Sequence, residues 1–240
     1  QTGLDLQALA RIIADGFKGR LVILLADCCY SGGLKQAAAL IAAKGKAAVS
    51  LTSADASNAS TGNWTFTQTI IDCLSGLSLA DHDRDGRVSL AETAREVGRA
   101  MKYRERQRHG YGSWNIAGTL VLSRTVTGPN PAPRNGYTPG DYALVNTGSK
   151  WETARLTGLT NTGASCELYH YSDKKTLFLS WDRIKKVTFK SHPVGGMVDV
   201  LWGGTWYRAK ILKVEDGFHW ITYPGWPSVW DEWVMDDRIR

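Results

Sequence analysis

The sequence of 240 residues lacks an apolar run long enough to cross a membrane, and neither half has a strong excess of one charge. The residues before Gly128 hold 15 basic and 11 acidic side chains, and the rest of the chain holds 14 and 12. Binding to nucleic acid relies on concentrated positive charge, which neither half provides. We therefore expect no membrane partner and no nucleic-acid partner.

Cysteine and histidine are scarce, and their positions exclude several kinds of site. The cysteines show neither the spacing of a zinc site nor that of a disulfide framework. They are Cys28, Cys29, Cys73 and Cys166. No histidine precedes Cys29, and the sequence predicts solvated or half-buried imidazoles at His82, His109, His170, His192 and His219. A signal peptide would lie before the first residue of this sequence, so the compartment stays open.

The most informative segment runs from Ala26 to Gly33 and reads A-D-C-C-Y-S-G-G. It directly follows the apolar run Leu21 to Leu25, which predicts a short buried strand. Active sites of open α/β folds form at the carboxyl ends of parallel strands, and this segment places a thiol there. The alternative is a buried thiol pair at a strand end, because free cysteine is often buried.

The motif Asp27-x-Cys29-Tyr30-Ser31-Gly32 resembles the D-x-C-[HY]-S-G motif of the caspase-like cysteine peptidases, which include metacaspases and their bacterial relatives. The resemblance covers about residues 3 to 125 and implies that Cys29 is the nucleophile. The predicted element order in this region is strand, helix, strand, loop, helix and strand. After the first strand come Ala47 to Asp55, a helix at Thr65 to Leu77, a helix at Leu90 to Tyr103 and a last strand at Ile116 to Ser123.

One catalytic partner is missing from the sequence. In this family the general base is a histidine on an earlier strand, and only 28 residues precede Cys29. A cysteine without a positioned base is a weak nucleophile near neutral pH. Either the histidine lies on a separate N-terminal fragment released by processing, or the residues that carry it are omitted. Both alternatives predict an incomplete sheet without its first strands and with bare apolar faces.

The resemblance also suggests a substrate preference. In metacaspases the Asp two residues before the nucleophile lines a pocket for Arg or Lys, and that residue is Asp27 in this sequence. Asp55, at the end of the next predicted strand, is a second candidate, because a guanidinium requires planar, charged acceptors. The alternative for Asp55 is a carboxylate that caps its own loop.

A second motif, from Asp81 to Glu92, reads D-H-D-R-D-G-R-V-S-L-A-E and matches the EF-hand calcium loop position by position. Short carboxylates and a bidentate glutamate surround a hard cation with oxygen, and Gly86 permits the sharp turn. The predicted Ca²⁺ ligands are Asp81, Asp83, Asp85, the carbonyl of Arg87, Ser89 through a bridging water, and Glu92. Whether the cation is a structural clip or a regulatory switch stays open.

The run from Arg95 to Arg108 carries six basic against two acidic side chains. Such a run predicts a solvated helix face, with nucleic-acid binding as the weaker alternative. Its end, Lys102 to His109, also suggests an exposed site for self-cleavage by a peptidase that prefers basic residues.

Residues 127–140 hold four of the seven prolines and three glycines, which predicts a linker. Beyond it lie eight of the ten tryptophans, among short alternating segments typical of small β-barrels. Two stretches of roughly fifty residues align as tandem copies. In the first, Gly140 to Val145 precedes Trp151 to Leu156; in the second, Gly196 to Val200 precedes Trp206 to Ile211. The predicted barrels occupy residues 141–190 and 194–240.

The second copy contains W-Y-R-A-K-I-L-K-V-E-D and I-T-Y-P-G-W-P-S-V-W-D-E-W-V, and it resembles chromo-barrel, Tudor-knot and Agenet modules of the Royal superfamily. These SH3-like barrels often bind methylated lysine in an aromatic cage, because cations are attracted to π faces. The resemblance implies cage residues at Tyr207, Tyr223, Trp226 and Trp230 and a core position at Trp233. The corresponding region of the first copy, Tyr169 to Lys174, has no such tryptophans. Alternatively, the aromatic residues only fill two small cores.

Together these patterns predict a partial α/β fold of caspase-hemoglobinase type at residues 1–126, followed by two all-β SH3-like barrels. The predicted function is a calcium-binding cysteine endopeptidase that cuts after Arg or Lys, processes itself and uses the barrels for targeting or regulation. Its expected partners are protein or peptide substrates and the histidine-bearing fragment of the same protein. The alternative is an inactive pseudopeptidase scaffold whose barrels bind a peptide or methylated lysine.

Overall fold

The computed structural model describes residues 5–57, 59–126, 132–170, 173–187, 190, 192–215, 218–235 and 238–240, without the side chains of 169, 170 and 173. The chain forms two compact units. Unit 1 consists of Gln1–Gly62, Val97–Leu120 and Phe189–Arg240, and unit 2 consists of Asn63–Glu96 and Val121–Thr188. Each unit therefore combines part of the α/β region with one small β-sheet.

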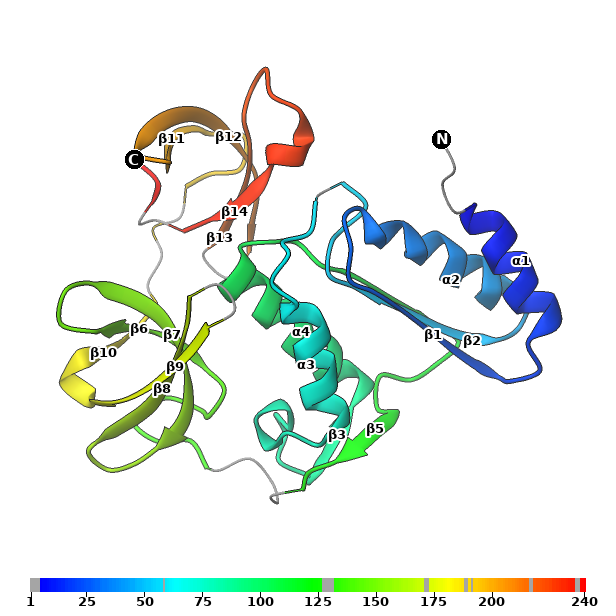
Figure 1. Ribbon diagram of the computed structural model, residues 1–240, viewed down its shortest axis with the longest axis horizontal. Helices are drawn as coiled ribbons and strands as arrows, with labels where there is room; N and C mark the ends of the chain where they lie inside the picture. Colours follow the sequence, from blue (N-terminus) through cyan, green and yellow to red (C-terminus); the bar gives the residue numbers. More distant parts are fainter. Residues whose placement is uncertain are drawn as a thin grey trace. The chain divides into compact units, whose positions relative to one another are not determined.

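The α/β part of unit 1 is a three-stranded sheet with the order β1-β2-β4. β1 (Leu21–Ala26) and β2 (Ala47–Thr52) are parallel, and β4 (Gly110–Trp114) runs antiparallel to β2. Helices α1 (Leu6–Gly16) and α2 (Leu34–Ala43) pack against each other, and α2 packs on β2, as Figure 1 shows. Both strands that the sequence predicted in this region are present.

Burial differs between the two faces of β1, since successive side chains of a strand point to opposite faces. Val22 packs with the buried small residues Ala37 and Ala38 of α2, which let the helix approach the sheet closely. Ile23 and Leu25 point the other way and are 38% and 45% exposed. Among the described residues, β1 pairs with a strand along one edge only. Within the described residues, one face of β1 is therefore partly exposed and one of its edges is unpaired.

The predicted last strand, Ile116 to Ser123, is wrong. The antiparallel strand of this sheet is β4, which ends before Asn115, a residue in the left-handed region with φ 55°. The Asn115 side-chain amide donates hydrogen bonds to the carbonyls of Ala42 (2.9 Å) and Lys46 (3.0 Å), and these bonds fix the turn. The end of the predicted segment forms another strand, β5 (Val121–Arg124), which belongs to unit 2.

The α-helical part of unit 2 contains α3 (Thr65–Leu74), the 3-10 turn η2 (Ser78–Ala80), β3 (Arg87–Ser89) and the start of α4 (Leu90–Glu105). β3 pairs antiparallel with β5, and Val88 of β3 forms a buried cluster with Cys73 and Ala80. Both helices predicted to flank the acidic motif are present, although α3 ends before Leu77. None of the helices in the described part of the chain is long and apolar enough to span a bilayer.

The small sheet of unit 2 is antiparallel throughout and has the order β10-β6-β7-β8-β9. Its strands are β6 (Tyr142–Asn146), β7 (Trp151–Leu159), β8 (Gly163–His170), β9 (Asp173–Ser180) and β10 (Ile184–Lys186), with the 3-10 turn η3 (Trp181–Arg183) before β10. Ala154, Leu156 and Cys166 lie in its apolar core and are at most 1% exposed. A register shift between Leu156 and Gly158 bends β7, as bulges do in small barrels.

The small sheet of unit 1 is also antiparallel, with the order β11-β12-β13-β14. Its elements are β11 (Met197–Trp202), β12 (Thr205–Glu215), β13 (Phe218–Thr222), the 3-10 turn η4 (Ser228–Trp230) and β14 (Glu232–Val234). Val200, Ile211 and Val234 are fully buried in its core, and Ile239 forms an isolated bridge with Val200. The protein is therefore a mixed α/β protein with small antiparallel sheets compatible with β-barrel modules.

Within unit 1, the end of α4 packs on aromatic residues of this small sheet. Lys102 is 8% exposed, and its Nζ lies 2.9 Å from a Glu215 carboxylate oxygen. The same Nζ lies 5.6 Å from the ring centre of Phe218 and 5.3 Å from that of Trp233. The prediction of a solvated basic face is wrong for this stretch, and Lys102 to His109 is not an exposed cleavage segment. Aromatic rings attract and cover cationic side chains, an effect that the local charge pattern does not reveal.

Candidate functional site

The predicted nucleophile lies in a tight turn at the end of β1. Cys29 is exposed, and the next residue, Tyr30, adopts a left-handed conformation with φ 57° that costs a non-glycine residue energy. The 3-10 turn η1 (Ser31–Gly33) follows and leads into α2. The backbone N–H of Ser60 donates to the Cys29 sulfur at 3.3 Å, and the thiol faces the Ser60 carbonyl at 3.9 Å.

Ser31 and Gly32 hold this turn against the loop that follows β2. The Ser31 hydroxyl accepts from the Ala54 N–H at 3.3 Å and donates to the Ala54 carbonyl at 3.5 Å. A Cβ at Gly32 would overlap the backbone of Asp55 and Ala56, so this position requires glycine. The Ser-Gly pair of the motif therefore serves a close approach between two backbone segments.

Of the two predicted specificity carboxylates, Asp55 has a clear partner. Its Oδ2 lies 3.0 Å from Nη2 of Arg108, and its Oδ1 accepts from the Ala56 N–H at 2.8 Å. The Arg108 guanidinium also lies 5.1 Å from the ring centre of Trp220. Asp55 thus both caps its own loop and binds a guanidinium, but that guanidinium belongs to the same unit. Asp27 is half-buried beside the turn.

In the described part of the chain, the Cys29 sulfur has hydrogen bonds to Ser60 and none to a histidine. The His170 side chain lies outside the described residues. Burial lowers the pKa of His109 to about 4, with the charge of Lys102 as the next cause, so this imidazole is neutral. His219 is fully buried, and its Nε2 accepts from the His192 backbone. Among the described residues, the hydrogen bonds of the Cys29 sulfur are therefore those with Ser60.

The acidic motif folds into a compact loop before β3. One carboxylate oxygen each from Asp81, Asp83 and Asp85 lies within 4.8 Å of the others. Gly86 has φ +82°, which permits the sharp turn, and its N–H donates to Asp81 at 3.0 Å. Burial raises the pKa of Asp81, against the effect of this hydrogen bond. An all-oxygen set of converging carboxylates fits a hard divalent cation such as Ca²⁺.

Glu92 closes the same loop from the first turn of α4. Its Oε1 accepts from the N–H groups of His82 (2.7 Å) and Asp83 (3.3 Å). Its Oε2 accepts from the backbone (2.8 Å) and hydroxyl (2.7 Å) of Ser89, which in turn accepts from the Glu92 N–H. This is a capping box at the helix start. Burial acts to raise the pKa of Glu92, but these hydrogen bonds outweigh it and lower the pKa. The remaining predicted ligand, Arg87, lies on β3.

A buried charge cluster in unit 2 lies beside this loop and was not predicted. Glu96 is 1% exposed, forms an ion pair with Arg155 of β7, and has a carboxylate oxygen 3.4 Å from Nε2 of His82. Arg155 is itself 6% exposed. These residues come from three distant segments, and no sequence pattern that we recognise signals their association.

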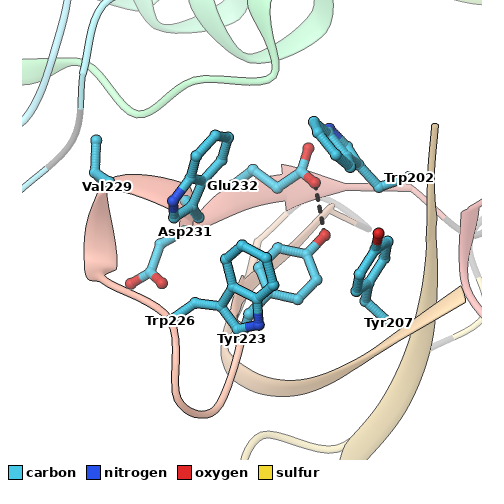
Figure 2. Close-up of a pocket in the computed structure, with 8 residues that line it drawn as sticks. Trp202, Tyr207, Tyr223, Trp226, Val229, Asp231 and Glu232 are labelled. Atoms are coloured by element: carbon cyan, nitrogen blue, oxygen red, sulfur yellow. Dashed lines mark hydrogen bonds between the residues drawn. The ribbon is translucent and has the colours of Figure 1, made fainter. Parts of the chain in front are cut away.

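The four predicted cage residues converge on one cavity of about 220 Å³ in the small sheet of unit 1. The cavity is lined by Trp202, Tyr207, Tyr223, Trp226, Val229, Trp230, Asp231 and Glu232. Neighbouring rings stand nearly perpendicular: Tyr207 and Trp226 have centres 6.2 Å apart at 84°, and Trp226 and Trp230 have centres 6.2 Å apart at 86°. Figure 2 shows aromatic rings from separate strands and turns around the shared space. Trp230 is 47% exposed, so the cavity opens to solvent.

Two carboxylates at this cavity differ in their hydrogen bonding. Glu232 accepts from the Tyr223 hydroxyl at 2.9 Å, drawn as a dashed line in Figure 2, and is held by Arg238 through two bonds of 2.7 Å. Burial and the Glu232 charge raise the pKa of Tyr223 well above its usual value. Burial also raises the pKa of Asp231, against a hydrogen bond from Thr222. Among the described residues, the buried Asp231 Oδ1 has no hydrogen-bond partner.

Sequence reasoning missed four of the lining residues: Trp202, Val229, Asp231 and Glu232. Trp202 ends β11 just before the Gly203-Gly204 turn, and it forms an edge-on pair with Trp230 at 5.9 Å. The sequence shows that residue 202 is aromatic, but the direction in which its side chain points depends on that turn. In the first small sheet, the region Tyr169 to Lys174 falls partly outside the described residues, so a corresponding cavity is not described.

Comparison with known proteins gives little further information. No family model matches the chain, and no curated protein matches it. Among solved structures, the chain is similar to the crystal structure of Arabidopsis thaliana AGDP1 AGD34, with 12% identity and a TM-score of 0.22. The match covers 42% of this chain and 79% of that one. A likeness this low supports no inference about ligand or activity, and the resemblance to caspase-like peptidases stays a prediction.

Proposed function

We propose that this chain carries the nucleophile of a caspase-like cysteine endopeptidase, together with a small β-module that binds a cationic side chain. The peptidase proposal is carried by the exposed Cys29 thiol at the carboxyl end of β1. Its turn contains a left-handed Tyr30 and is fixed to the loop after β2 through Ser31. An accessible sulfur on a rigid backbone is what covalent catalysis requires.

In the proposed mechanism, the Cys29 sulfur attacks the carbonyl carbon of the scissile peptide bond. A histidine from another part of the same protein takes the thiol proton and returns it to the leaving amine. The backbone N–H of Cys29 contributes to stabilisation of the oxyanion, whose charge develops in the transition state.

Preference for Arg or Lys before the scissile bond rests on Asp27 and Asp55. In the structure the Asp55 carboxylate accepts the Arg108 guanidinium at 3.0 Å, which is the geometry that a substrate guanidinium would require. A substrate guanidinium would have to compete with Arg108 for this carboxylate. We therefore expect Arg108→Gln to lower KM for Arg substrates.

The test compares the full-length wild-type protein with Cys29→Ala, using Cys28→Ala as the matched control on the neighbouring exposed thiol. Intact mass after incubation reports self-processing, and fluorogenic peptides ending in Arg, Lys or Asp report specificity. Cleavage after Arg or Lys that is lost only in Cys29→Ala supports the proposal. Equal cleavage by wild type and Cys29→Ala would refute the assigned nucleophile.

The alternative is an inactive scaffold, and two observations favour it. No described histidine bonds to Cys29, and Asp55 is engaged by Arg108. If no peptide is cut and the full-length protein keeps its intact mass with and without calcium, the scaffold alternative replaces the peptidase proposal.

The binding proposal is carried by the aromatic cavity of 220 Å³ in the small sheet of unit 1. Each ring face attracts a cation by about 0.5 to 2 kcal/mol, more where the cation loses water. A methylated lysine fits this cavity because its methyl groups pack against aromatic rings and its ammonium group loses water more easily than that of unmodified lysine. Asp231 offers a buried acceptor, so the mono- and dimethyl forms, which keep an N–H donor, should bind more tightly than the trimethyl form.

Calorimetric titration with peptides carrying lysine in its four methylation states tests this binding. Trp226→Ala should weaken binding of the dimethyl peptide at least tenfold, from the loss of one ring. Trp206→Ala is the matched control, because this tryptophan is on β12 next to Tyr207 but outside the cavity. Equal affinity for methylated and unmodified lysine would contradict the cage assignment.

We also propose calcium at the acidic loop, held by Asp81, Asp83, Asp85 and Glu92. The bound ion would neutralise the converging carboxylates and join the segment before β3 to the first turn of α4. Arg87 and Ser89 complete the proposed set through a carbonyl and a bridging water.

A further inference from the structure

The loop after β2 determines the surroundings of the Cys29 sulfur. The Ser60 N–H that donates to this sulfur at 3.3 Å lies in that loop, far from Cys29 in sequence. Ser53, at the start of the loop, places its hydroxyl 3.0 Å from that of Ser60. The position of the donor therefore depends on how the ends of this loop are held.

One buried side chain holds both ends of the loop. Gln107 is 6% exposed, and its Nε2 donates to the Ser53 carbonyl at 2.6 Å and to the Ser60 hydroxyl at 3.4 Å. Its Oε1 accepts from the Thr61 N–H at 2.8 Å. Both ends of the amide are thus used, and the Ser60 hydroxyl and the next residue, Thr61, bond to the same group.

Gln107 is itself fixed by the small sheet of unit 1. The Trp233 N–H donates to the carbonyl of Arg106 at 3.1 Å, and the Gln107 N–H donates to the Met101 carbonyl at 3.1 Å. On the other side, Arg108 lies over the Trp220 ring. The segment that carries the amide is therefore anchored on β13 and β14, and it is also bonded to the start of the loop through the pair of Arg108 with Asp55.

We propose that Gln107 is a positioning residue for the Cys29 thiol, acting through the Ser60 N–H. The proposal rests on the proposed function insofar as Cys29 is the nucleophile. A backbone N–H directed at sulfur favours the thiolate over the thiol, because it donates a hydrogen bond to the charged form. Gln107 thereby holds the donor that faces the Cys29 sulfur without itself contacting the sulfur.

The test is the rate at which iodoacetamide alkylates Cys29 in a Cys28→Ser background of the full chain. Cys73 and Cys166 are buried, so Cys29 is then the exposed thiol among the four cysteines. Because its side chain is already exposed, access does not limit the reaction, and the rate at pH 7 follows the thiolate fraction. Peptide mapping by mass confirms the modified residue.

We expect Gln107→Ala to slow alkylation at pH 7 by about twofold to fivefold, the effect of losing one modest hydrogen bond. At a pH high enough to ionise every thiol, the rate should equal that of the wild type. Gln107→Glu keeps the side-chain volume and the acceptor for Thr61 but loses the donors to Ser53 and Ser60, so it should slow the reaction as well. Gln7→Ala, at an exposed position on α1, is the control and should change nothing.

Hydrogen exchange of the Ser60 amide gives a second readout, and it should accelerate in both Gln107 variants. A folded Gln107 variant that keeps the wild-type alkylation rate at pH 7 and the wild-type exchange at Ser60 would overturn the proposal. If Gln107→Ala does not fold, the isosteric Gln107→Glu decides. Slower alkylation in a protein without peptidase activity would support the positioning role and remove the peptidase proposal, so the two failures are distinguishable.

Discussion

The buried ion cluster of unit 2 allows a quantitative prediction for Glu96→Gln. This substitution removes the negative charge that Glu96 shares with Arg155 and His82, while it keeps the shape of the side chain. Breaking a buried ion pair by removing one partner typically costs about 3 to 5 kcal/mol. The glutamine carbonyl still accepts a hydrogen bond worth about 1 kcal/mol, so we expect a loss of about 2 to 4 kcal/mol.

Thermal unfolding followed by circular dichroism measures this loss. For a chain of this size, about 2 to 4 kcal/mol corresponds to a decrease in Tm of roughly 5 to 15 °C. The double variant Glu96→Gln/Arg155→Met should recover a large part of the stability, because it no longer buries a charge without its counterion. Asp182→Asn, at an exposed position in the same unit, is the control and should stay within about 0.5 kcal/mol of the wild type.

Two results would refute this reasoning. One is a loss below about 1 kcal/mol for Glu96→Gln, which would mean that solvent or other groups replace the carboxylate. The other is a double variant no more stable than Glu96→Gln, which would show that the Arg155 charge is not the cause of the loss.

Three further perturbations have defined outcomes. Burial lowers the pKa of His109 to about 4 from 6.5, so as the pH falls the imidazole is protonated in the unfolded chain before it is protonated in the folded protein. The free energy of unfolding is therefore highest above pH 6.5 and decreases as the pH falls toward 4. In urea titrations at several pH values, His109→Gln should reduce this decrease by about 2 kcal/mol. An unchanged pH profile would contradict the assignment. Gly32→Ala should destabilise the protein by about 2 to 4 kcal/mol, because the added Cβ would overlap backbone atoms. The control is Gly62→Ala, which has no atom near the added Cβ and should be neutral. Equal effects of the two substitutions would argue against the close approach at Gly32. Millimolar Ca²⁺ should raise the Tm of the wild type but not that of Asp83→Asn, since binding to the folded state stabilises it by mass action; a similar rise in both would exclude this loop.

Local patterns in the sequence were sufficient for several elements. The apolar run Leu21 to Leu25 predicted the strand β1, although only one face of that strand is buried. Gly86 predicted a sharp turn, and the helical pattern from Leu90 predicted the helix that follows; the structure has both. These features depend on neighbours within a few residues, so they can be predicted from local sequence.

Features that depend on distant residues could not be predicted in this way. β4 has the sequence G-Y-G-S-W, a poor strand former by composition, and it is a strand because β2 offers it an edge. The pairs of Asp55 with Arg108 and of Glu96 with Arg155 join segments far apart along the chain. The basic run was misread for the same reason, because the rings that cover Lys102 lie more than a hundred residues later.

The division of the chain into two interleaved units also affects its synthesis. All residues of unit 2 have been made once Thr188 has been added, whereas the last segment of unit 1 starts at Phe189. Domains that emerge first from the ribosome tend to fold first. During translation, unit 2 can therefore fold before the aromatic residues that contact Lys102 and Arg108 have been synthesised. These residues are Phe218, Trp220 and Trp233. A nascent chain that stalls after Thr188 would expose these cations and the Gln107 segment. Chaperones and proteases could then bind a segment that is covered in the finished protein.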